Sequence, residues 1–320
     1  MVDHKISVVI VAKNEENCIG RVIEAVLTQD YPSELLDIVL VDNHSTDRTL
    51  EIASQFDKVS VLSAVGTIGS LRNQGVEVCQ GSIVSFLDGD CIVPTNWLRQ
   101  SLVTLLSNAQ IVAVNAMMSY DHDAEPSWVE RCWVRYQQSR FMDDVTETDS
   151  LASFCFVAWR QAGDSVSWFD ASLATCEDAD LGYRFIERGG TVVVDRNIQV
   201  AHLGNARSLE MFFRRQLWQG SSNLQGISRH RFQLSEVKSV ALPLGYIVAA
   251  LLLPAVAIFG LWWIFLALIA ALVFVPLGIA LKKNHYGDFK EVVQMAIIWS
   301  TYLTARGIAL FSRTIKESPR

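Results

Sequence analysis

The chain has 320 residues, half of them hydrophobic, and a formal net charge of −7. This length allows one large core or two smaller ones, and the acidic balance gives no sign of the basic patch that nucleic-acid binding requires. The six cysteines are scattered without a C-x-x-C pair. Neither a zinc site nor a disulfide framework is indicated, so a reducing, cytosolic setting is expected.

The first half of the chain alternates between strand and helix patterns. Residues 6–12 form a continuous apolar run typical of a buried strand, and strands at 37–41, 59–62 and 83–87 follow. Helices are predicted at 19–27 and at 70–79. Between them, a further helix is predicted to run through residue 55, with Ser45 or Thr46 as its N-cap. This alternation predicts an α/β fold in which a parallel sheet carries helices on both faces.

The pattern continues more irregularly beyond residue 94. A helix at 95–107 and a strand at 110–119 precede a polar region at 121–149, read as a helix plus a flexible loop. A strand at 154–159, a loop at 163–176 and a helix at 178–188 follow, with Gly189 and Gly190 as the helix C-cap. A strand at 192–194 and a helix at 208–224 complete this part.

Two carboxylates, Asp88 and Asp90, come directly after an apolar strand in residues 83–90. Ligands of open α/β sheets bind beyond the carboxyl ends of the strands, and hard oxygen ligands suit Mg²⁺ or Mn²⁺. An ordinary polar turn is the alternative for this segment alone. Other polar turns end strands at Asn14-Glu15 and Asp42. Glu177 and Asp178 open a helix, where acids also serve as caps and dipole partners.

Together these segments resemble the family 2 glycosyltransferases, which have the GT-A fold, a Rossmann-like nucleotide-binding domain with a mainly parallel sheet. The matching segments are VVIVAKNEE (8–16), DIVLVDNHSTDRTLEIA (37–53), LRNQGVEVCQGSIVSFLDGDCIVPTNWL (71–98) and CEDADLGYRFIERGG (176–190). They keep the family's order and, with their surroundings, cover roughly the first 230 residues.

The resemblance implies roles for individual residues. Asp42 is expected to hydrogen-bond the nucleotide base, with Ala12 and Glu15 lining the base and ribose pocket and Arg72 near the nucleotide. Asp88 and Asp90 look like the D-x-D pair, with Asp90 as the more direct metal ligand. The divalent cation, Mg²⁺ or Mn²⁺, would stabilise charge on the leaving diphosphate.

The same resemblance gives Asp178 as the catalytic base, with Glu177 beside it disfavouring the ionised form of its neighbour. His202 stands where some related enzymes place a histidine near the metal or diphosphate, although a lone histidine is often structural. Arg207, Arg214 and Arg215 are explained equally well as phosphate contacts or as a solvated helix face.

Processive members of the family carry a Q-x-x-R-W motif, whereas this chain has Arg215-Gln216-Leu217-Trp218. The arginine before the tryptophan is missing, so addition of a single sugar is expected.

The C-terminal part carries a run of 43 residues, 239–281, without Asp, Glu, Lys or Arg. As a helix it would extend roughly 64 Å, about twice a hydrocarbon core, so two transmembrane helices at about 240–259 and 261–281 are predicted over a buried soluble hairpin. Lys238, Lys282 and Lys283 place both ends on the cytoplasmic side. Residues 290–312 are expected to form an interfacial helix, because Arg306 disfavours a third crossing.

These observations predict a catalytic domain at 1–235 and a membrane region at 236–320. The expected protein is a metal-dependent, inverting glycosyltransferase on the inner membrane, with its catalytic domain in the cytosol. It would transfer a sugar from a nucleotide-sugar, in the first place a UDP-sugar, to a lipid-linked or polysaccharide acceptor. The alternative is a non-catalytic nucleotide-sugar-binding membrane protein that recruits partners for glycan assembly. Turnover of the donor separates the two.

Overall fold

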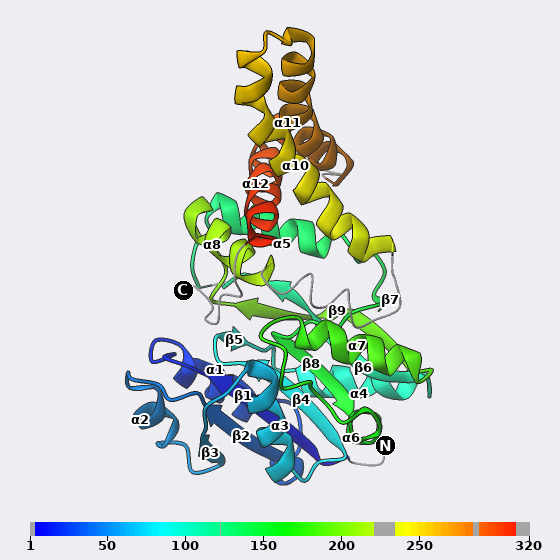
Figure 1. The fold of residues 1–320 in the computed structure, drawn as a ribbon. Coiled ribbons are helices and arrows are strands. Elements are labelled where there is room, and N and C mark those ends of the chain that lie inside the picture. The colour runs from blue at the N-terminus through cyan, green and yellow to red at the C-terminus, as the bar shows by residue number, and fades with distance from the viewer. Residues whose placement is uncertain (1–3, 122, 221–233, 284–287, 312–320) are drawn as a thin grey trace. The chain divides into compact units, whose positions relative to one another are not determined.

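The computed structural model describes residues 4–121, 123–220, 234–283 and 288–311 (Figure 1). The chain forms two compact units. The first comprises residues 1–125 and 141–204, and the second comprises residues 126–140 and 205–320. The short segment 126–140 therefore leaves the sheet-containing unit and joins the C-terminal helices.

The first unit is built on one mixed sheet. The nine strands of the described residues are β1 (Ile6–Ala12), β2 (Leu36–Asp42), β3 (Val59–Ser63), β4 (Ile83–Asp88), β5 (Cys91–Ile92), β6 (Ile111–Ser119), β7 (Val145–Thr148), β8 (Cys155–Trp159) and β9 (Thr191–His202). Their order is β3-β2-β1-β4-β8-β6-β9-β5, with β7 also pairing with β9. Strands β1, β2, β3 and β4 are parallel to one another, and β6 is parallel to its neighbour β9. Strands β5, β7 and β8 run antiparallel to their partners. The predicted mainly parallel sheet is confirmed.

Helices cover both faces of this sheet, also as predicted. Alternate residues of β1 separate the two cores: Val8 and Ile10 pack with α1 (Ile19–Leu27) and α4 (Trp97–Ser107), while Val9 packs with α3 (Ile68–Val78) and α7 (Glu177–Glu187). Because successive side chains of a strand point to opposite faces, a continuous apolar run is what such a doubly covered strand requires.

Several local predictions need correction. The helix α2 spans only Thr49–Ala53, and neither Ser45 nor Thr46 caps it, because the Ser45 hydroxyl instead donates to Asp42. The segment expected as a loop contains the helix α6 (Arg160–Val166), and the strand expected at 192–194 extends over all of β9. The C-cap at Gly189 is confirmed, since its φ of +83° favours glycine.

The second unit is helical in its described residues. It consists of α5 (Trp128–Gln138), α8 (Leu209–Gly220), α10 (Leu234–Ile258), α11 (Trp262–Lys283) and α12 (Phe289–Ala309). Residues 221–224, the end of the predicted 208–224 helix, lie outside the described residues, as does residue 312.

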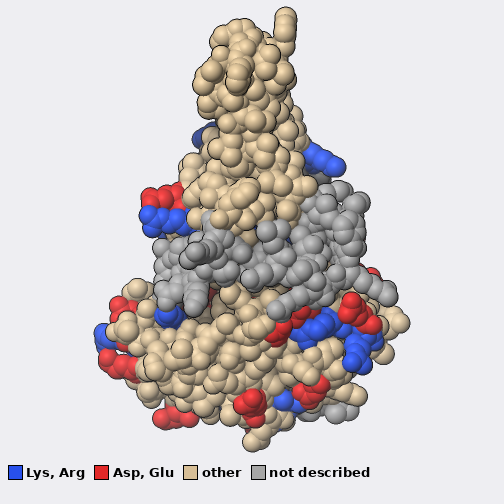
Figure 2. All heavy atoms as spheres, in the orientation of Figure 1, with Lys and Arg blue, Asp and Glu red and all other residues tan. Residues whose placement is uncertain are grey.

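Two of these helices are long and apolar enough to cross a membrane, at Ser239–Ile258 and Trp262–Lys282. Only 6% and 11% of these spans are buried within the protein, which is less burial than the core helix of a soluble protein has. In Figure 2, the visible face of the upper end of this hairpin carries no Lys, Arg, Asp or Glu. The two apolar helices follow one another as a hairpin, and their crossing of a membrane stays a prediction.

Candidate active site

The carboxyl ends of three parallel strands meet at one edge of the sheet. In the register of the strands, Asp42 of β2 lies beside Ala12 of β1, and Asp88 of β4 lies beside Val11 on the other side. The acidic turns that follow β2 and β4 therefore flank the end of β1. The predicted grouping of these residues follows from the strand order β2-β1-β4.

Two loops beyond β1 and β2 are joined by hydrogen bonds. The backbone N–H groups of Asn14 and Glu15 donate to the hydroxyls of Ser45 and Thr49, both at 2.7 Å. In return, the Asn14 side chain accepts from the backbone of Thr46 at 2.7 Å. Asn14 has a φ of +53°, a conformation that asparagine tolerates better than most residues. These contacts fix the position of the loop that follows β1, which contains Glu15 and begins after Ala12.

Asp42 helps to hold these two loops together. Its side chain is completely buried, and its carboxylate accepts hydrogen bonds from the backbone N–H of Ser45 at 2.9 Å and from the Ser45 hydroxyl. The same hydroxyl accepts from Asn14, so Asp42 orders both loops through one serine. The expected contact between Asp42 and a nucleotide base stays a prediction.

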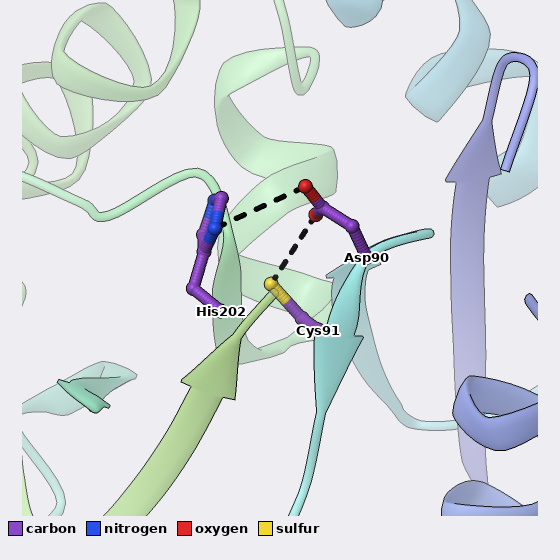
Figure 3. Close-up of side chains that lie close together, drawn as sticks. All are labelled: Asp90, Cys91 and His202. Atoms are coloured by element: carbon purple, nitrogen blue, oxygen red, sulfur yellow. Dashed lines mark hydrogen bonds and ion pairs between the residues drawn. The ribbon is translucent and has the colours of Figure 1, made fainter. Parts of the chain in front are cut away.

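The D-G-D turn brings Asp90 toward His202 (Figure 3). The two-residue strand β5 pairs antiparallel with the end of β9, which sets Cys91 opposite His202. Asp90 Oδ2 and His202 Nδ1 lie 3.9 Å apart, with 19% and 12% of their side chains exposed. Gly89 is required in this turn, because a Cβ there would lie 2.9 Å from the Cβ of Ala12.

The donor atoms near Asp90 fit a divalent cation. Asp90, Cys91 and His202 each offer an atom within 4.8 Å of the others, and His202 Nδ1 is buried without a hydrogen-bond partner in the described residues. Burial, and then the charges of Asp90 and Asp88, raise the pKa of the Cys91 thiol well above its usual value. Carboxylate oxygens suit Mn²⁺ and Mg²⁺, whereas thiolates select softer metals, so Asp90, with His202 beside it, offers the fitting donors.

Gly204 leaves room for the Asp90 carboxylate. A Cβ at Gly204 would lie only 2.1 Å from Asp90 Oδ2 and 3.1 Å from His202 Cε1. The absence of a side chain at position 204 is therefore part of the site. The sequence indicated His202 but neither Gly204 nor Cys91 as part of the site.

Arg72 lies on the other side of the D-G-D turn. Its side chain is 1% exposed, and Nη2 donates to Asp88 Oδ1 and to the carbonyl of Ser153, both at 2.8 Å. Nη1 donates to Glu177 Oε1, also at 2.8 Å. The structure thus joins Arg72, Asp88 and Glu177, while Asp88 lies outside the cluster of Asp90 and His202. The expected contact of Arg72 with a nucleotide is untested, and the burial of its guanidinium argues against that contact.

The start of α7 holds Glu177 and Asp178 side by side in different surroundings. Glu177 is buried against Arg72, whereas Asp178 is partly exposed. The Asp178 carboxylate accepts from the backbone N–H groups of Ser153, at 3.0 Å, and Ala179, at 2.8 Å. Hydrogen bonds of this kind hold a carboxylate in a fixed orientation.

One arginine faces two carboxylates, the buried Glu177 and the partly exposed Asp88, which leaves an excess of negative charge. Burial raises the pKa of Glu177 to about 7, and the charge of Asp178 adds to this effect. Burial also raises the pKa of Asp88, although the charge of Arg72 opposes the change. Burial alone would lower the pKa of Arg72, but the charges of Asp88 and Glu177 raise it above the usual value. A cation near Asp88 and Asp90 would balance the excess charge.

The sheet, the polar strand ends and the D-G-D turn define a nucleotide-binding domain of the GT-A class. The family model "Glycosyl transferase family 2" matches residues 7–164, and the chain therefore carries a glycosyl transferase family 2 domain. The fold and the family resemblance predicted from the sequence are confirmed.

Relatives of known name agree with this assignment. The chain is 26% identical to glycosyltransferase AglE of Haloferax volcanii over 244 residues, which cover 74% of this chain and 79% of that protein. It is 27% identical to the beta-monoglucosyldiacylglycerol synthase of a Nostoc species over 195 residues, 56% of this chain and 40% of the relative's length.

Solved structures show the same fold at low identity. The mannosyltransferase PcManGT of Pyrobaculum calidifontis, solved with GDP-Man and Mn²⁺, aligns with a TM-score of 0.62 at 15% identity over 95% of this chain and 86% of that one. S. aureus TarS 1-349, solved with UDP-GlcNAc, aligns with a TM-score of 0.51 at 16% identity over 97% and 92%. The solved structures show the fold, while the family match and the named relatives support nucleotide-sugar glycosyl transfer as the general activity.

Proposed function

We propose that the protein is a membrane-anchored, metal-dependent, inverting glycosyltransferase that moves one sugar from a nucleotide-sugar to a lipid-linked acceptor. The observation that carries this proposal is the joining of the D-G-D turn to the start of α7: Asp88 and Glu177 share Arg72, and Asp178 follows Glu177. Such an arrangement would place a diphosphate beside a carboxylate base, on a glycosyl transferase family 2 domain.

The donor is proposed to bind along the edge formed by β1, β2 and β4. Ala12 and Glu15 would line the base and ribose pocket, and Asp42 would support or contact the base. A UDP-sugar is the donor we favour, and TarS, a neighbour in fold, was solved with UDP-GlcNAc. Because PcManGT was solved with GDP-Man, a GDP-sugar is the competing donor to test.

Asp90 and His202 would hold Mn²⁺ or Mg²⁺, with Asp88 close by. The support is the buried His202 Nδ1, which has no hydrogen-bond partner among the described residues, and the space that Gly204 leaves at Asp90. When bound, the cation would neutralise charge on the departing diphosphate. Mn²⁺ is present in the structure of PcManGT.

Asp178 is proposed to take the proton from the acceptor hydroxyl as that oxygen attacks the anomeric carbon. The bond from the anomeric carbon to the diphosphate oxygen breaks on the opposite side, so the configuration inverts. The two backbone N–H groups that donate to Asp178 would hold its carboxylate in a fixed orientation. General-base catalysis typically contributes about 10²–10⁴-fold to a rate.

The hairpin of α10 and α11 is proposed to cross the inner membrane twice, which leaves the catalytic domain in the cytosol. Each candidate span has about 20 residues, the length needed for a hydrocarbon core. A relative is named as a synthase of beta-monoglucosyldiacylglycerol, which supports a lipid acceptor. Residues 1–235 are proposed as the catalytic domain and 236–320 as the membrane region.

The helix α12 is proposed to lie at the membrane surface. Near its start Glu291 accepts from Arg135 of α5 at 2.5 Å, and near its end Arg306 donates to Gln216 and Gln219 of α8, at 3.1 and 3.2 Å. Both ends of α12 are thus held by helices that precede the hairpin. These contacts support a helix that stays beside α5 and α8, while its middle also packs against α10, where Ser300 and Tyr246 share a hydrogen bond of 2.8 Å.

A donor panel tests the proposal. Full-length protein in detergent is incubated with UDP-glucose, UDP-GlcNAc and GDP-mannose, with Mn²⁺, with Mg²⁺ or with EDTA, and the released nucleoside diphosphate is measured. We expect cation-dependent release from one donor, with a UDP-sugar preferred. Nucleotide-sugar binding without any release, with or without lipid acceptors, would favour the non-catalytic binding protein instead.

A further inference from the structure

We propose that Arg72 is a positioning residue that couples the D-G-D turn to the catalytic base, and that it is not a nucleotide contact. The kinetic part of this inference rests on the proposed transferase function. The structural part concerns only how the chain holds Asp88, Ser153 and the start of α7, and it can be tested without any turnover.

The first step is the burial of Arg72. Only 1% of its side chain is exposed, and its guanidinium already donates to two carboxylates and one carbonyl. The ring of Phe169 lies against it, with the guanidinium carbon 5.4 Å from the ring centroid. A nucleotide would have to break these interactions to reach the guanidinium, and burying an arginine without its partners is costly.

The second step is the connection to Asp178. The peptide groups of Ser153 serve both residues, because its carbonyl accepts from Arg72 at 2.8 Å and its N–H donates to Asp178 Oδ2 at 3.0 Å. Arg72 also binds Glu177, which precedes Asp178 in the chain. Two paths therefore lead from Arg72 to the base, and a third contact leads to Asp88 in the D-G-D turn.

The third step is the need for a guanidinium. Different nitrogens of Arg72 bind Glu177 and Asp88, so the planar fork sets the spacing of the two carboxylates. Lysine carries the same charge but offers one nitrogen on a flexible stem. Arg72→Lys therefore keeps the charge of the cluster and removes the geometric bridge.

The experiment compares two variants with the wild-type full-length protein. Arg72→Lys keeps the charge, and the double variant Arg72→Met with Glu177→Gln keeps the net charge of the cluster while removing the bridge. The matched control is Arg184→Met, which removes an ion pair with Asp180 within the same helix, away from the D-G-D turn. Folding is checked by circular dichroism and thermal unfolding.

Three quantities are measured: turnover at saturating donor, donor affinity by calorimetry with Mn²⁺, and hydrogen exchange of the Ser153 amide. In both Arg72 variants we expect turnover to fall about 10²-fold, since small misplacements of catalytic groups cost this much, with donor Kd within about threefold of wild type. Exchange at Ser153 should be about tenfold faster, because its peptide loses an anchor. Arg184→Met should resemble wild type in all three.

A turnover loss above about tenfold with donor Kd within about threefold supports the proposal, and any other combination of the two in an Arg72 variant overturns it. Unchanged exchange at Ser153 also overturns it. If the wild-type protein turns over no donor, the proposed function fails, and the exchange measurement alone decides the role of Arg72.

Discussion

Gly204→Ala tests whether the observed position of the Asp90 carboxylate is the functional one. A methyl group at residue 204 would lie 2.1 Å from Asp90 Oδ2, whereas ordinary van der Waals contact begins near 3.4 Å. The carboxylate must therefore move by about 1 Å or more. Among the described residues, the glycines with a positive φ are Gly189 and Gly260, and Gly204 is not one of them. Alanine therefore fits the backbone conformation at residue 204.

The substitution should separate function from stability. The group that clashes is the end of a flexible side chain, which can rotate away at small cost in folding free energy. A displacement of about 1 Å at a catalytic group can reduce turnover about 10²-fold. We therefore expect a thermal unfolding midpoint close to wild type, a weaker affinity for Mn²⁺, and donor turnover reduced by about that factor. Calorimetric Mn²⁺ titration and nucleoside diphosphate release measure these effects.

Gly20→Ala is the matched control, because its added methyl would meet Ile52 at an ordinary 3.5 Å within the helix α1. This variant should keep wild-type metal affinity and turnover. If Gly204→Ala also keeps both, the Asp90 carboxylate does not act from its observed position, and the reasoning about this part of the site is wrong.

Three further predictions concern the base, the buried acid and the topology. Asp178→Asn keeps the size of the side chain but removes its basicity, so turnover should fall about 10²–10⁴-fold while calorimetric donor affinity persists; near-normal turnover would leave Asp178 as a helix cap. Because the pKa of Glu177 is raised from 4.5 to about 7 in the folded protein, the folded state binds this proton more tightly, and the free energy of unfolding should fall as pH rises through that window. Glu177→Gln should flatten this slope in denaturant titrations, and an identical slope in the variant would contradict the assignment. A cysteine at residue 318, outside the described residues, should be protected from impermeant reagents in intact cells, whereas labelling from outside would mean that α12 crosses the membrane.

Much of the fold was predictable because the strands carry their own pattern. Ile6–Ala12 is apolar throughout, as a strand covered on both faces must be, and the boundaries of β1 were predicted without error. The polar turns after β2 and β4 were predictable as a group, since the ends of neighbouring parallel strands share one edge of the sheet. The two-residue strand β5 carries no periodicity to detect.

The contacts within the site could be predicted only in part. The pairing of β5 with β9 brings Asp90 to His202, and 112 positions of chain separate these residues. The role of Arg72 depends on Glu177, 105 residues later, and the sequence of α3 does not reveal that its arginine faces inward. Such pairings depend on the strand order and on helix orientation, which local sequence patterns do not encode.

The same limit explains the error at Ser45. Serine after a strand and before a helix is a typical N-cap, and the sequence pattern favoured that role. In the structure its hydroxyl instead joins Asp42 to the backbone of Asn14, and Asp47 accepts from the backbone N–H of Thr49 at 3.0 Å. A side chain with several possible partners follows the tertiary contacts available to it.

Transfer of labelled sugar to lipid in membranes tests the central proposal most directly. Membranes containing the wild-type protein, or Asp90→Ala, are incubated with a radiolabelled UDP-sugar, with Mn²⁺ or with EDTA, and the organic phase is counted. We predict label in the lipid fraction only with the wild-type protein and the divalent cation. Equal labelling with Asp90→Ala and in EDTA, or no transfer from any nucleotide-sugar, would contradict a metal-dependent glycosyltransferase acting on a lipid acceptor.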